Sequence, residues 1–444
     1  MQNEKDQKFH EGRRDFMKQG SLLAGGMLAA PLFSQANYFS GSAGVIKVAL
    51  IGCGGRGSGA AVQALSTKEN VQLVAMADAF RDRLDGAYDN IKEAMEGKEG
   101  RLAVKEENKF VGFDAYKKAI ALADVVILTT PPGFRPIHFE EAVKQGKHVF
   151  MEKPVATDPA GIKKVLEVAE QAKAKKLNVV VGLQRHYQDS YRELVKRVQD
   201  GAIGDILSIQ VWWNQGALWV KPRKPEYTEM EYQMRNWYYF NWLCGDHIVE
   251  QHIHNIDAGN WFKGGVPVSA VGMGGRSWRN GKEYGEIFDH HYVEYRYADG
   301  VVMNAQCRHW KDSTSRVDEE IVGTKGKVIA DKAVILDHKG NVVYKFEDKK
   351  PRNPYQTEHD ELFAAIAKGE FKFQDAKMGA EATHSAIIGR MATYSGQTIP
   401  WDKALESGIS LQPTKYAFDA APPVLPDADG LYSYAKPGSV KYFS

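Results

Sequence analysis

Four side chains that could move protons or bind a metal recur at helical spacing in the segment GDHIVEQHIHNIDAGNW. His247, Glu250, His254 and Asp257 follow one another at intervals of three, four and three residues. If the segment is one helix, these intervals place all four on one face. An imidazole with a pKa near neutrality suits a general base or proton relay, and His254 is the candidate. Alternatively the face binds a metal, or His247 and Asp257 are structural groups satisfied by hydrogen bonds.

Lys153 is a further candidate for chemistry, because it follows directly on an apolar run in the segment KHVFMEKP. If that run is a strand of a parallel sheet, its carboxyl end is where ligands bind. An ammonium group beside a substrate oxygen stabilises negative charge that develops there and can pass on a proton. The simpler alternative for a Glu-Lys-Pro tripeptide is a solvated loop without a function.

A glycine-rich stretch near the start of the chain predicts a nucleotide site. Residues 52–57 read G-C-G-G-R-G, which matches G-x-G-x-x-G, and they lie between an apolar run and a helical pattern. Glycines there allow a tight turn and a close approach of the backbone to a pyrophosphate at the helix N-terminus. The residues expected to bind the dinucleotide are Gly52, Gly54, Gly55, Arg56 and Gly57.

Asp78, at the end of the next apolar run, bears on the choice of dinucleotide. A carboxylate at this place accepts hydrogen bonds from ribose hydroxyls and repels a 2′-phosphate, which favours NAD over NADP. Arg81 and Arg83 follow closely and weaken that preference, so NADP stays possible.

Alternating strand-like and helical runs must position these groups. Continuous apolar runs predict buried strands at residues 45–51, 71–78, 123–129, 147–154 and 178–184. Helical patterns lie between them, for example at 161–175. Such alternation predicts right-handed crossovers and a doubly wound parallel sheet.

The pattern changes from about residue 185. Strand pairs with alternating residues are joined there by Asp-Gly, Lys-Gly and Gly-Asn turns, which predicts a large, mostly antiparallel open sheet. We therefore expect an α/β protein with a dinucleotide-binding domain at 45–184 and an α+β domain at 185–412. A Pro-rich tail at 413–444 is expected to be extended.

Residues 1–36 have the pattern of an export signal. Arg13 and Arg14 precede a short apolar run rich in glycine and alanine, and Ser34-Gln35-Ala36 fits a cleavage site. RRDFMK resembles the twin-arginine motif of bacterial signals, which carry folded proteins out of the cytoplasm. The alternative is a basic disordered N-terminus. The apolar run is too short to span a bilayer, so we expect a periplasmic protein without an integral membrane anchor.

The composition is that of an ordinary globular chain. Of the 444 residues 26% are charged and 43% hydrophobic, and the formal net charge is +2. Positive and negative residues are interspersed, which indicates neither a nucleic-acid partner nor a basic membrane patch. The three cysteines, Cys53, Cys244 and Cys307, are too few and too scattered for a disulfide framework or a zinc knuckle.

Nearly the whole chain after residue 36 resembles the Gfo/Idh/MocA oxidoreductases, which act mainly on sugars and cyclitols. The resemblance rests on the segments VALIGCGGRG, VVILTTPP, GKHVFMEKPVA and HNIDAGNW. It implies a Rossmann domain followed by an α/β domain whose open sheet often mediates contacts in a homo-oligomer. It also implies that Thr130, Pro131 and Glu152 join the glycine-rich turn and Lys153 in binding the cofactor.

The resemblance also implies roles for the reactive groups. Lys153 corresponds to the family's lysine beside the reacting hydroxyl and the nicotinamide, and His254 to its catalytic histidine. Glu250 stands where the family usually has aspartate, and it would orient His254 or bind a sugar hydroxyl. His252 stands where glycine is common. The candidates for contact with the substrate are Arg185, His186 and Asn214.

These observations predict an exported NAD-dependent oxidoreductase that acts on a sugar or glycoside hydroxyl. Free nicotinamide nucleotide is not dependable outside the cytoplasm, so the cofactor would stay bound. Of the two segments that could hold it, the arm at 37–44 is favoured over the tail, because the arm ends beside the phosphate loop. One alternative is a redox-neutral glycosidase that works through a 3-keto intermediate, although the His-Gly run of such enzymes is missing. Another is a non-catalytic sugar- or nucleotide-binding protein.

Overall fold

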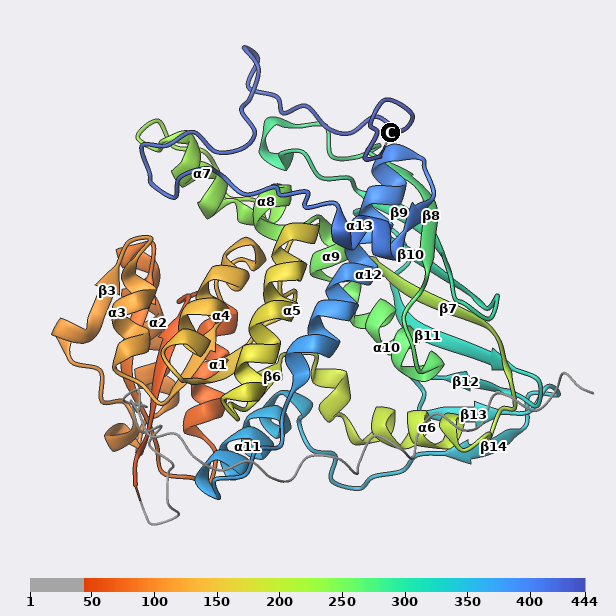
Figure 1. Ribbon diagram of the computed structural model, residues 1–444, viewed down its shortest axis with the longest axis horizontal. Helices are drawn as coiled ribbons and strands as arrows, with labels where there is room; N and C mark the ends of the chain where they lie inside the picture. Colours follow the sequence, from red (N-terminus) through yellow and green to blue (C-terminus); the bar gives the residue numbers. More distant parts are fainter. Residues whose placement is uncertain (1–43, 444) are drawn as a thin grey trace, which may run out of the picture. The chain divides into compact units, whose positions relative to one another are not determined.

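The computed structural model describes residues 44–443 (Figure 1). Strands and helices alternate in the first part of the described chain. The strands are β1 (Ile46–Ile51), β2 (Val71–Asp78), β3 (Lys109–Val111), β4 (Val125–Leu128), β5 (His148–Met151) and β6 (Val179–Val181). The helices are α1 (Gly55–Leu65), α2 (Arg81–Ala94), α3 (Ala115–Ala121), α4 (Arg135–Lys144) and α5 (Pro159–Ala174).

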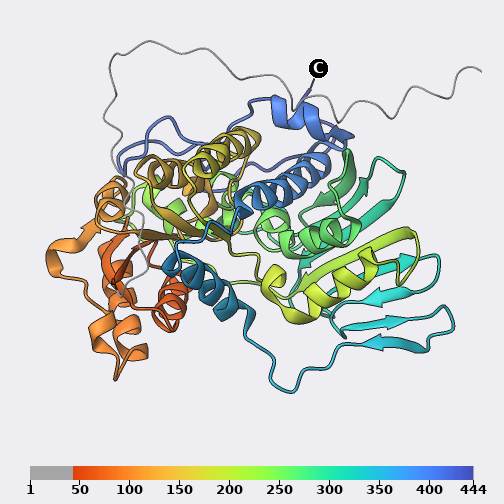
Figure 2. The same cartoon turned by 60° about the horizontal axis from the view of Figure 1, so that its bottom comes forward.

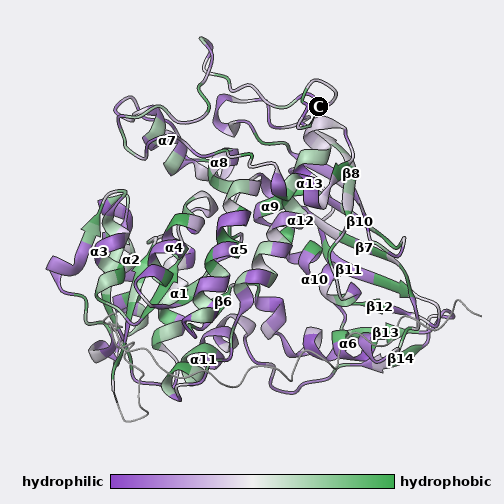
Figure 3. Cartoon of the chain, viewed as in Figure 1, coloured by the Kyte–Doolittle hydropathy of each residue, from purple (hydrophilic) through white to green (hydrophobic). Residues whose placement is uncertain are grey.

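These strands form one parallel six-stranded sheet in the order β3-β2-β1-β4-β5-β6. All residues of β4 and β6 are buried, which is why such strands read as unbroken apolar runs. Figure 3 colours apolar residues green. The strand order reverses between β1 and β4, and in open α/β sheets the ligand binds at such a reversal.

The second part of the chain forms a nine-stranded sheet in the order β14-β13-β12-β11-β7-β10-β9-β8-β15. Its strands are β7 (Ile206–Gln215), β8 (Ser269–Gly275), β9 (His290–Arg296), β10 (Val302–His309), β11 (Arg316–Gly323), β12 (Lys327–Ile329), β13 (Val334–Leu336), β14 (Val342–Lys345) and β15 (Ile399–Pro400). Only β7 and β10 pair in parallel within it, and the other neighbours are antiparallel. Figure 2 shows strands of this sheet side by side, next to the helices.

The helices of this part are α6 (Asp189–Gln199), α7 (Glu229–Arg235), α8 (Asn241–Cys244), α9 (His247–Glu250), α10 (Ile253–Lys263), α11 (Pro354–Ala367), α12 (Asp375–Ser395) and α13 (Trp401–Glu406). The 3-10 helices are η1 (Glu99–Arg101), η2 (Glu106–Asn108), η3 (Pro132–Phe134), η4 (Gln184–Tyr187), η5 (Trp237–Tyr239) and η6 (Lys282–Tyr284).

Helix α12 packs against elements of both sheets, because small residues let it approach them closely. A Cβ on Gly379 would lie 2.9 Å from the side chain of Val181 in β6. A Cβ on Gly389 would lie 2.1 Å from the hydroxyl oxygen of Tyr295 in β9. The helix therefore fixes the second sheet beside the carboxyl end of the first.

Helix α11 packs on the first sheet, although it lies within the stretch expected to form the second domain. It contacts α1, and Leu362, Phe363 and Ile366 join the apolar core around β1 and β2. Residues 413–443 contain no helix or strand. Phe418 packs on Phe80 and Phe113 of the first part of the chain, whereas Tyr432 packs on Phe240 of the second part.

The predicted fold class is confirmed: a parallel doubly wound sheet precedes a mostly antiparallel one. The expectation of one continuous helix from His247 to Asp257 is wrong, since α9 ends at Glu250 and α10 begins at Ile253. The segment expected to be an export signal, 1–36, lies outside the described residues. Within residues 44–443, no helix combines the length and the hydropathy needed to cross a membrane.

Candidate active site

A cavity of about 630 Å³ lies where the glycine-rich turn, the end of β5 and the α9–α10 segment meet. It is lined from the first sheet by residues that include Gly52, Gly54, Gly55, Arg56, Gly57, Asp78, Thr130, Pro131, Glu152 and Lys153. The second part of the chain contributes residues that include Trp213, Trp219, Trp237, Glu250, Gln251 and His254. The cavity therefore joins the predicted nucleotide site to the predicted reactive groups.

The glycine-rich turn has the shape that a pyrophosphate site needs. A Cβ on Gly57 would lie 2.1 Å from the carbonyl oxygen of Gly52, so no side chain fits there. Gly52 has a φ of +96°, and a Cβ on it would lie 2.4 Å from the backbone nitrogen of Thr130. At Gly54 and Gly55 the space is open, at the N-terminus of α1. Backbone N–H groups can therefore reach a phosphate there, and a dinucleotide fits this turn.

Asp78 lies at the end of β2, beside the turn. Its carboxylate accepts hydrogen bonds from the backbone N–H groups of Cys53 (2.7 Å) and Phe80 (2.9 Å). Burial raises the pKa of Asp78, and these two hydrogen bonds oppose that rise. Arg81 forms ion pairs with Asp85 (2.9 Å) and Glu106, whereas Arg83 lines the cavity. Of the two arginines, Arg83 is the one placed to meet a 2′-phosphate.

Ion pairs fix the wall of the cavity behind the turn. The guanidinium of Arg56 donates to Glu152 (2.6 Å) and to Glu358 of α11 (3.3 Å). Arg135 donates to the backbone oxygens of Glu152 (3.0 Å) and Thr130 (2.7 Å). The end of β5 and the Thr-Pro turn after β4 are therefore held against each other.

Lys153 and Glu250 form an ion pair inside the cavity. The Lys153 ammonium donates to the Glu250 carboxylate (3.1 Å) and also to the Glu250 backbone oxygen. That carbonyl is free because the helix breaks here: the N–H of His254 bonds to Gln251 (3.2 Å) instead of to Glu250. Burial raises the pKa of Glu250, and Lys153 opposes the rise. The break between α9 and α10 thus leaves the Glu250 carbonyl free as a second acceptor for the Lys153 ammonium group.

His254 lies beside this pair, with its ring stacked on Trp213 at a centroid distance of 5.7 Å. Burial, together with the cations Lys153 and Arg185, lowers the pKa of His254 well below its ordinary value. The imidazole is therefore neutral at pH 7 and has a lone pair with which to accept a proton. Its Nδ1 makes no hydrogen bond to the described part of the chain.

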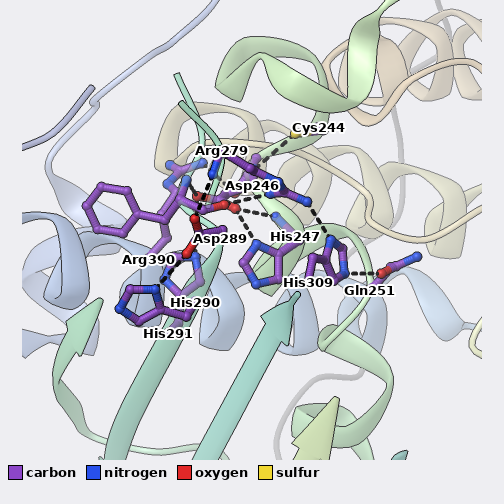
Figure 4. A network of polar contacts seen from close by, with 12 residues as sticks. Cys244, Asp246, His247, Gln251, Arg279, Asp289, His290, His291, His309 and Arg390 are labelled. Carbon is purple, nitrogen blue, oxygen red and sulfur yellow. Dashed lines mark hydrogen bonds and ion pairs between the residues drawn. The ribbon is translucent and has the colours of Figure 1, made fainter. Parts of the chain in front are cut away.

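Gln251, which no sequence motif indicates, presents an amide N–H₂ to the cavity. The indole of Trp213 can only donate, and it donates to Oε1 of Gln215 (2.9 Å). The Gln215 amide nitrogen therefore donates to Oε1 of Gln251 (3.1 Å), and His309 Nε2 donates to the same oxygen (2.8 Å). Arg279 donates to Nδ1 of His309 and so fixes this tautomer (Figure 4). The Gln251 nitrogen is left to donate to a ligand.

A buried cluster behind this wall has the residue types of a metal site. One ligand atom each from Asp246, His247 and His291 lie within 4.8 Å of one another. However, the Asp246 carboxylate already accepts hydrogen bonds from His247 Nδ1 (2.8 Å), the N–H of Phe288 (2.9 Å) and the hydroxyl of Tyr394 (2.6 Å). Figure 4 shows Asp246 beside His247. Hydrogen bonds therefore hold the Asp246 carboxylate in place, whereas Nε2 of His247 is buried without a hydrogen-bond partner in the described part of the chain.

Two family models together match most of the chain. The model of the oxidoreductase family with an NAD-binding Rossmann fold matches residues 46–181, and the Gfo/Idh/MocA C-terminal domain model matches residues 191–329. The chain belongs to the Gfo/Idh/MocA oxidoreductase family. Its first domain is therefore an NAD-binding Rossmann domain, in agreement with the shape of the glycine-rich turn.

Relatives of this Gfo/Idh/MocA protein include inositol 2-dehydrogenases. That of Rhizobium meliloti is 25% identical over 64% of this chain and 76% of its own length. That of Gluconacetobacter diazotrophicus is 30% identical over 35% of this chain and 41% of its own length.

Solved structures of the same fold include scyllo-inositol dehydrogenase from Lactobacillus casei with NAD(H) and scyllo-inositol. It has a TM-score of 0.61 and 20% identity, over 81% of this chain and 100% of that chain. Levoglucosan dehydrogenase with NADH and levoglucosan has a TM-score of 0.60 and 17% identity, over 80% of this chain and 99% of that chain.

In this Gfo/Idh/MocA chain the three residues expected to touch the substrate do not line the cavity. Arg185 is buried and pairs with Glu319. His186 bonds to Asp257 (2.9 Å) and stacks on Trp261. Asn214 contacts Gln306 at 3.4 Å. Each of the three side chains is bonded instead to a residue that does not line the cavity.

The four side chains expected on one helical face also have separate partners. His247 bonds to Asp246, Glu250 to Lys153, and Asp257 to His186. They do not converge on one point, so the metal site considered for this face is not assembled within the described residues.

Proposed function

We propose that this protein oxidises a secondary hydroxyl group of a carbohydrate with an NAD cofactor that stays bound. One observation carries the proposal: Lys153, Glu250 and His254 line the same cavity as the glycine-rich turn and Asp78. Bound NAD supplies the acceptor for the hydride that leaves the hydroxyl carbon.

The side chains of the cavity serve the hydroxyl oxygen and its proton. The Lys153 ammonium, fixed by both acceptors of Glu250, stabilises negative charge on that oxygen. The neutral imidazole of His254 accepts the hydroxyl proton. Glu250 neutralises the ammonium and holds it in place, and the Gln251 amide donates to a neighbouring hydroxyl.

A polyhydroxylated ring as substrate is supported by the relatives and by the cavity wall. The relatives include inositol 2-dehydrogenases, and a solved structure of the same fold contains levoglucosan. Trp213 offers an aromatic face, and Gln251, Glu250 and Lys153 offer hydrogen-bonding groups, a combination that suits C–H faces and hydroxyls.

Export by the twin-arginine route and assembly into a homo-oligomer are parts of the same proposal. The pattern of residues 1–36 supports export to the periplasm after the chain has folded around NAD inside the cell. Exposed apolar side chains on neighbouring strands of the second sheet, such as Val271, Met273 and Tyr292, support contact between copies of the chain.

The test is a panel of sugars, cyclitols and glycosides, added to purified protein with NAD while absorbance at 340 nm is recorded. We expect at least one member of the panel to raise the absorbance with saturable kinetics. Analysis of the product should find a ketone in place of one ring hydroxyl. A panel without any change, with intact protein that binds NAD, contradicts the proposed oxidation. A cleaved glycoside without net NADH would instead indicate the redox-neutral glycosidase.

A further inference from the structure

Two tryptophans of the segment between β7 and α8 line the cavity and are only partly buried, although Trp237 also packs against an apolar core. Trp219 is 41% exposed and Trp237 is partly exposed, whereas the core residue Trp242 is 1% exposed. Their rings lie side by side, with centroids 6.0 Å apart and planes at 59°. Large aromatic rings exposed at the mouth of a cavity commonly serve a ligand.

The backbone that carries these rings is held rigidly. The hydroxyl of Tyr239 donates to the backbone oxygen of Trp219 (2.9 Å), and the N–H of Lys221 donates to the side chain of Asn236 (2.9 Å). The rings of Tyr238 and Tyr239 pack edge-on against Trp219. The platform therefore exists before a ligand binds, which lowers the entropic cost of binding.

The platform adjoins the reactive groups. Tyr238 contacts Trp219 at a centroid distance of 6.1 Å and stacks on His309 at 6.0 Å. His309 in turn bonds to Gln251, which follows Glu250 in the chain. If the reacting hydroxyl of a sugar lies at Lys153, a group attached to that sugar would therefore extend toward the two tryptophans.

We propose that Trp219 and Trp237 form a second subsite, which binds a ring attached to the oxidised sugar. The ligand chemistry is a ring with an apolar face, either the C–H face of a second sugar or an aromatic aglycone. The preferred substrates would then be glycosides rather than free monosaccharides. This inference rests on the proposed function for the place of the sugar, but ring binding itself needs no oxidation.

The experiment measures binding by calorimetry and turnover at 340 nm with the full protein. The probes are the methyl glycosides and the 4-nitrophenyl glycosides of glucose and galactose, and the disaccharides cellobiose and lactose. The variants are Trp219→Ala and Trp219→Phe. The matched control is Trp278→Ala, a tryptophan of similar exposure (38%) that does not line the cavity.

We expect a ring substituent to tighten binding by about tenfold over the methyl group, in the range of aromatic contacts. Trp219→Ala should remove that advantage and leave the methyl glycoside within about twofold, while Trp219→Phe and the control keep most of it. If only the aryl glycosides, or only the disaccharides, bind more tightly than the methyl glycosides, the result supports the subsite and shows which kind of ring it binds.

Equal binding of methyl and ring glycosides to the unchanged protein, or no binding of either, overturns the subsite. A loss in Trp219→Ala that is the same for all probes also overturns it, because it indicates a general effect on folding. Ring-dependent binding without any change at 340 nm would support the subsite and contradict the proposed oxidation. The two proposals can therefore fail separately.

Discussion

At the scale of single residues, the proposed chemistry depends most on Lys153, because Glu250 holds its ammonium group in the cavity through two acceptors. We expect Lys153→Met to lower kcat by about a hundredfold or more, which is the loss seen when one group that stabilises an oxyanion is removed. Nucleotide content should stay unchanged, since the glycine-rich turn is intact. Steady-state kinetics with an added electron acceptor that reoxidises the bound NADH, and the nucleotide released on denaturation, check both parts. A kcat near that of the unchanged protein would exclude Lys153 from the chemical step.

His254 determines the expected dependence on pH. Burial and two nearby cations lower its pKa, so the imidazole is neutral above that pKa and protonated below it. Activity should therefore fall as the pH falls through a value below about 6.5, the ordinary pKa of histidine. The sequence alone suggested a pKa near neutrality, because it does not show the burial. His254→Ala should lower kcat and lose the acid limb of the kcat profile, and an unchanged profile would place the proton acceptor elsewhere.

Lys153 and His254 could be singled out from the sequence because they lie in short motifs, and both line the cavity; their catalytic roles stay a prediction. Trp219, Trp237 and Gln251 are not among the site residues that the sequence predicts. The place of the two tryptophans depends on how the loop between β7 and α8 folds. The role of Gln251 depends on which atom of its amide is already hydrogen-bonded to His309. Arg185 illustrates the opposite case: it follows β6, yet its partner Glu319 comes from a distant strand that holds it away from the cavity.

At the scale of elements, the turn between β1 and α1 must stay closed. Gly57→Ala would put a methyl group 2.1 Å from the Gly52 carbonyl oxygen, so the turn has to open. We expect this variant to lose most of its bound nucleotide and to melt at a lower temperature. The control is Gly59→Ala, in the same helix, where the nearest atom to a new Cβ is 3.5 Å away. If both variants retain nucleotide equally, the turn is not the site of the pyrophosphate.

Strands that are buried on both faces could be predicted from the sequence, whereas a strand at the edge of the sheet and a break within a helical segment could not. β3 has only three residues and none is buried, so no apolar run indicates it. The break between α9 and α10 contains no proline or glycine. It coincides with the hydrogen bond from Lys153 to the Glu250 carbonyl, a contact between residues about a hundred positions apart that local patterns cannot indicate.

At the scale of the whole molecule, the tail is placed to slow the loss of cofactor. Phe418 packs on Phe80 and Phe113 with centroid distances of 5.5 and 4.8 Å, and both of these rings line the cavity. Removing residues 413–444 should shorten the residence of the nucleotide by about a hundredfold if about 3 kcal/mol of contacts is lost. The sequence favoured the arm at 37–44 instead, and most of that arm lies outside the described residues. Dissociation rates of two truncated proteins, one without each segment, decide between them.

The central claim is that the chain holds its own NAD and reduces it with a carbohydrate. The most direct measurement uses protein purified without added nucleotide, mixed with the best substrate of the panel while absorbance at 340 nm is followed. We predict a rise equivalent to about one NADH per chain, which then stops because no second acceptor is present. Lys153→Met, with the same nucleotide content, should show no rise on this timescale. A rise that requires free NAD would contradict retention, and the absence of any rise with nucleotide present would contradict the oxidation itself.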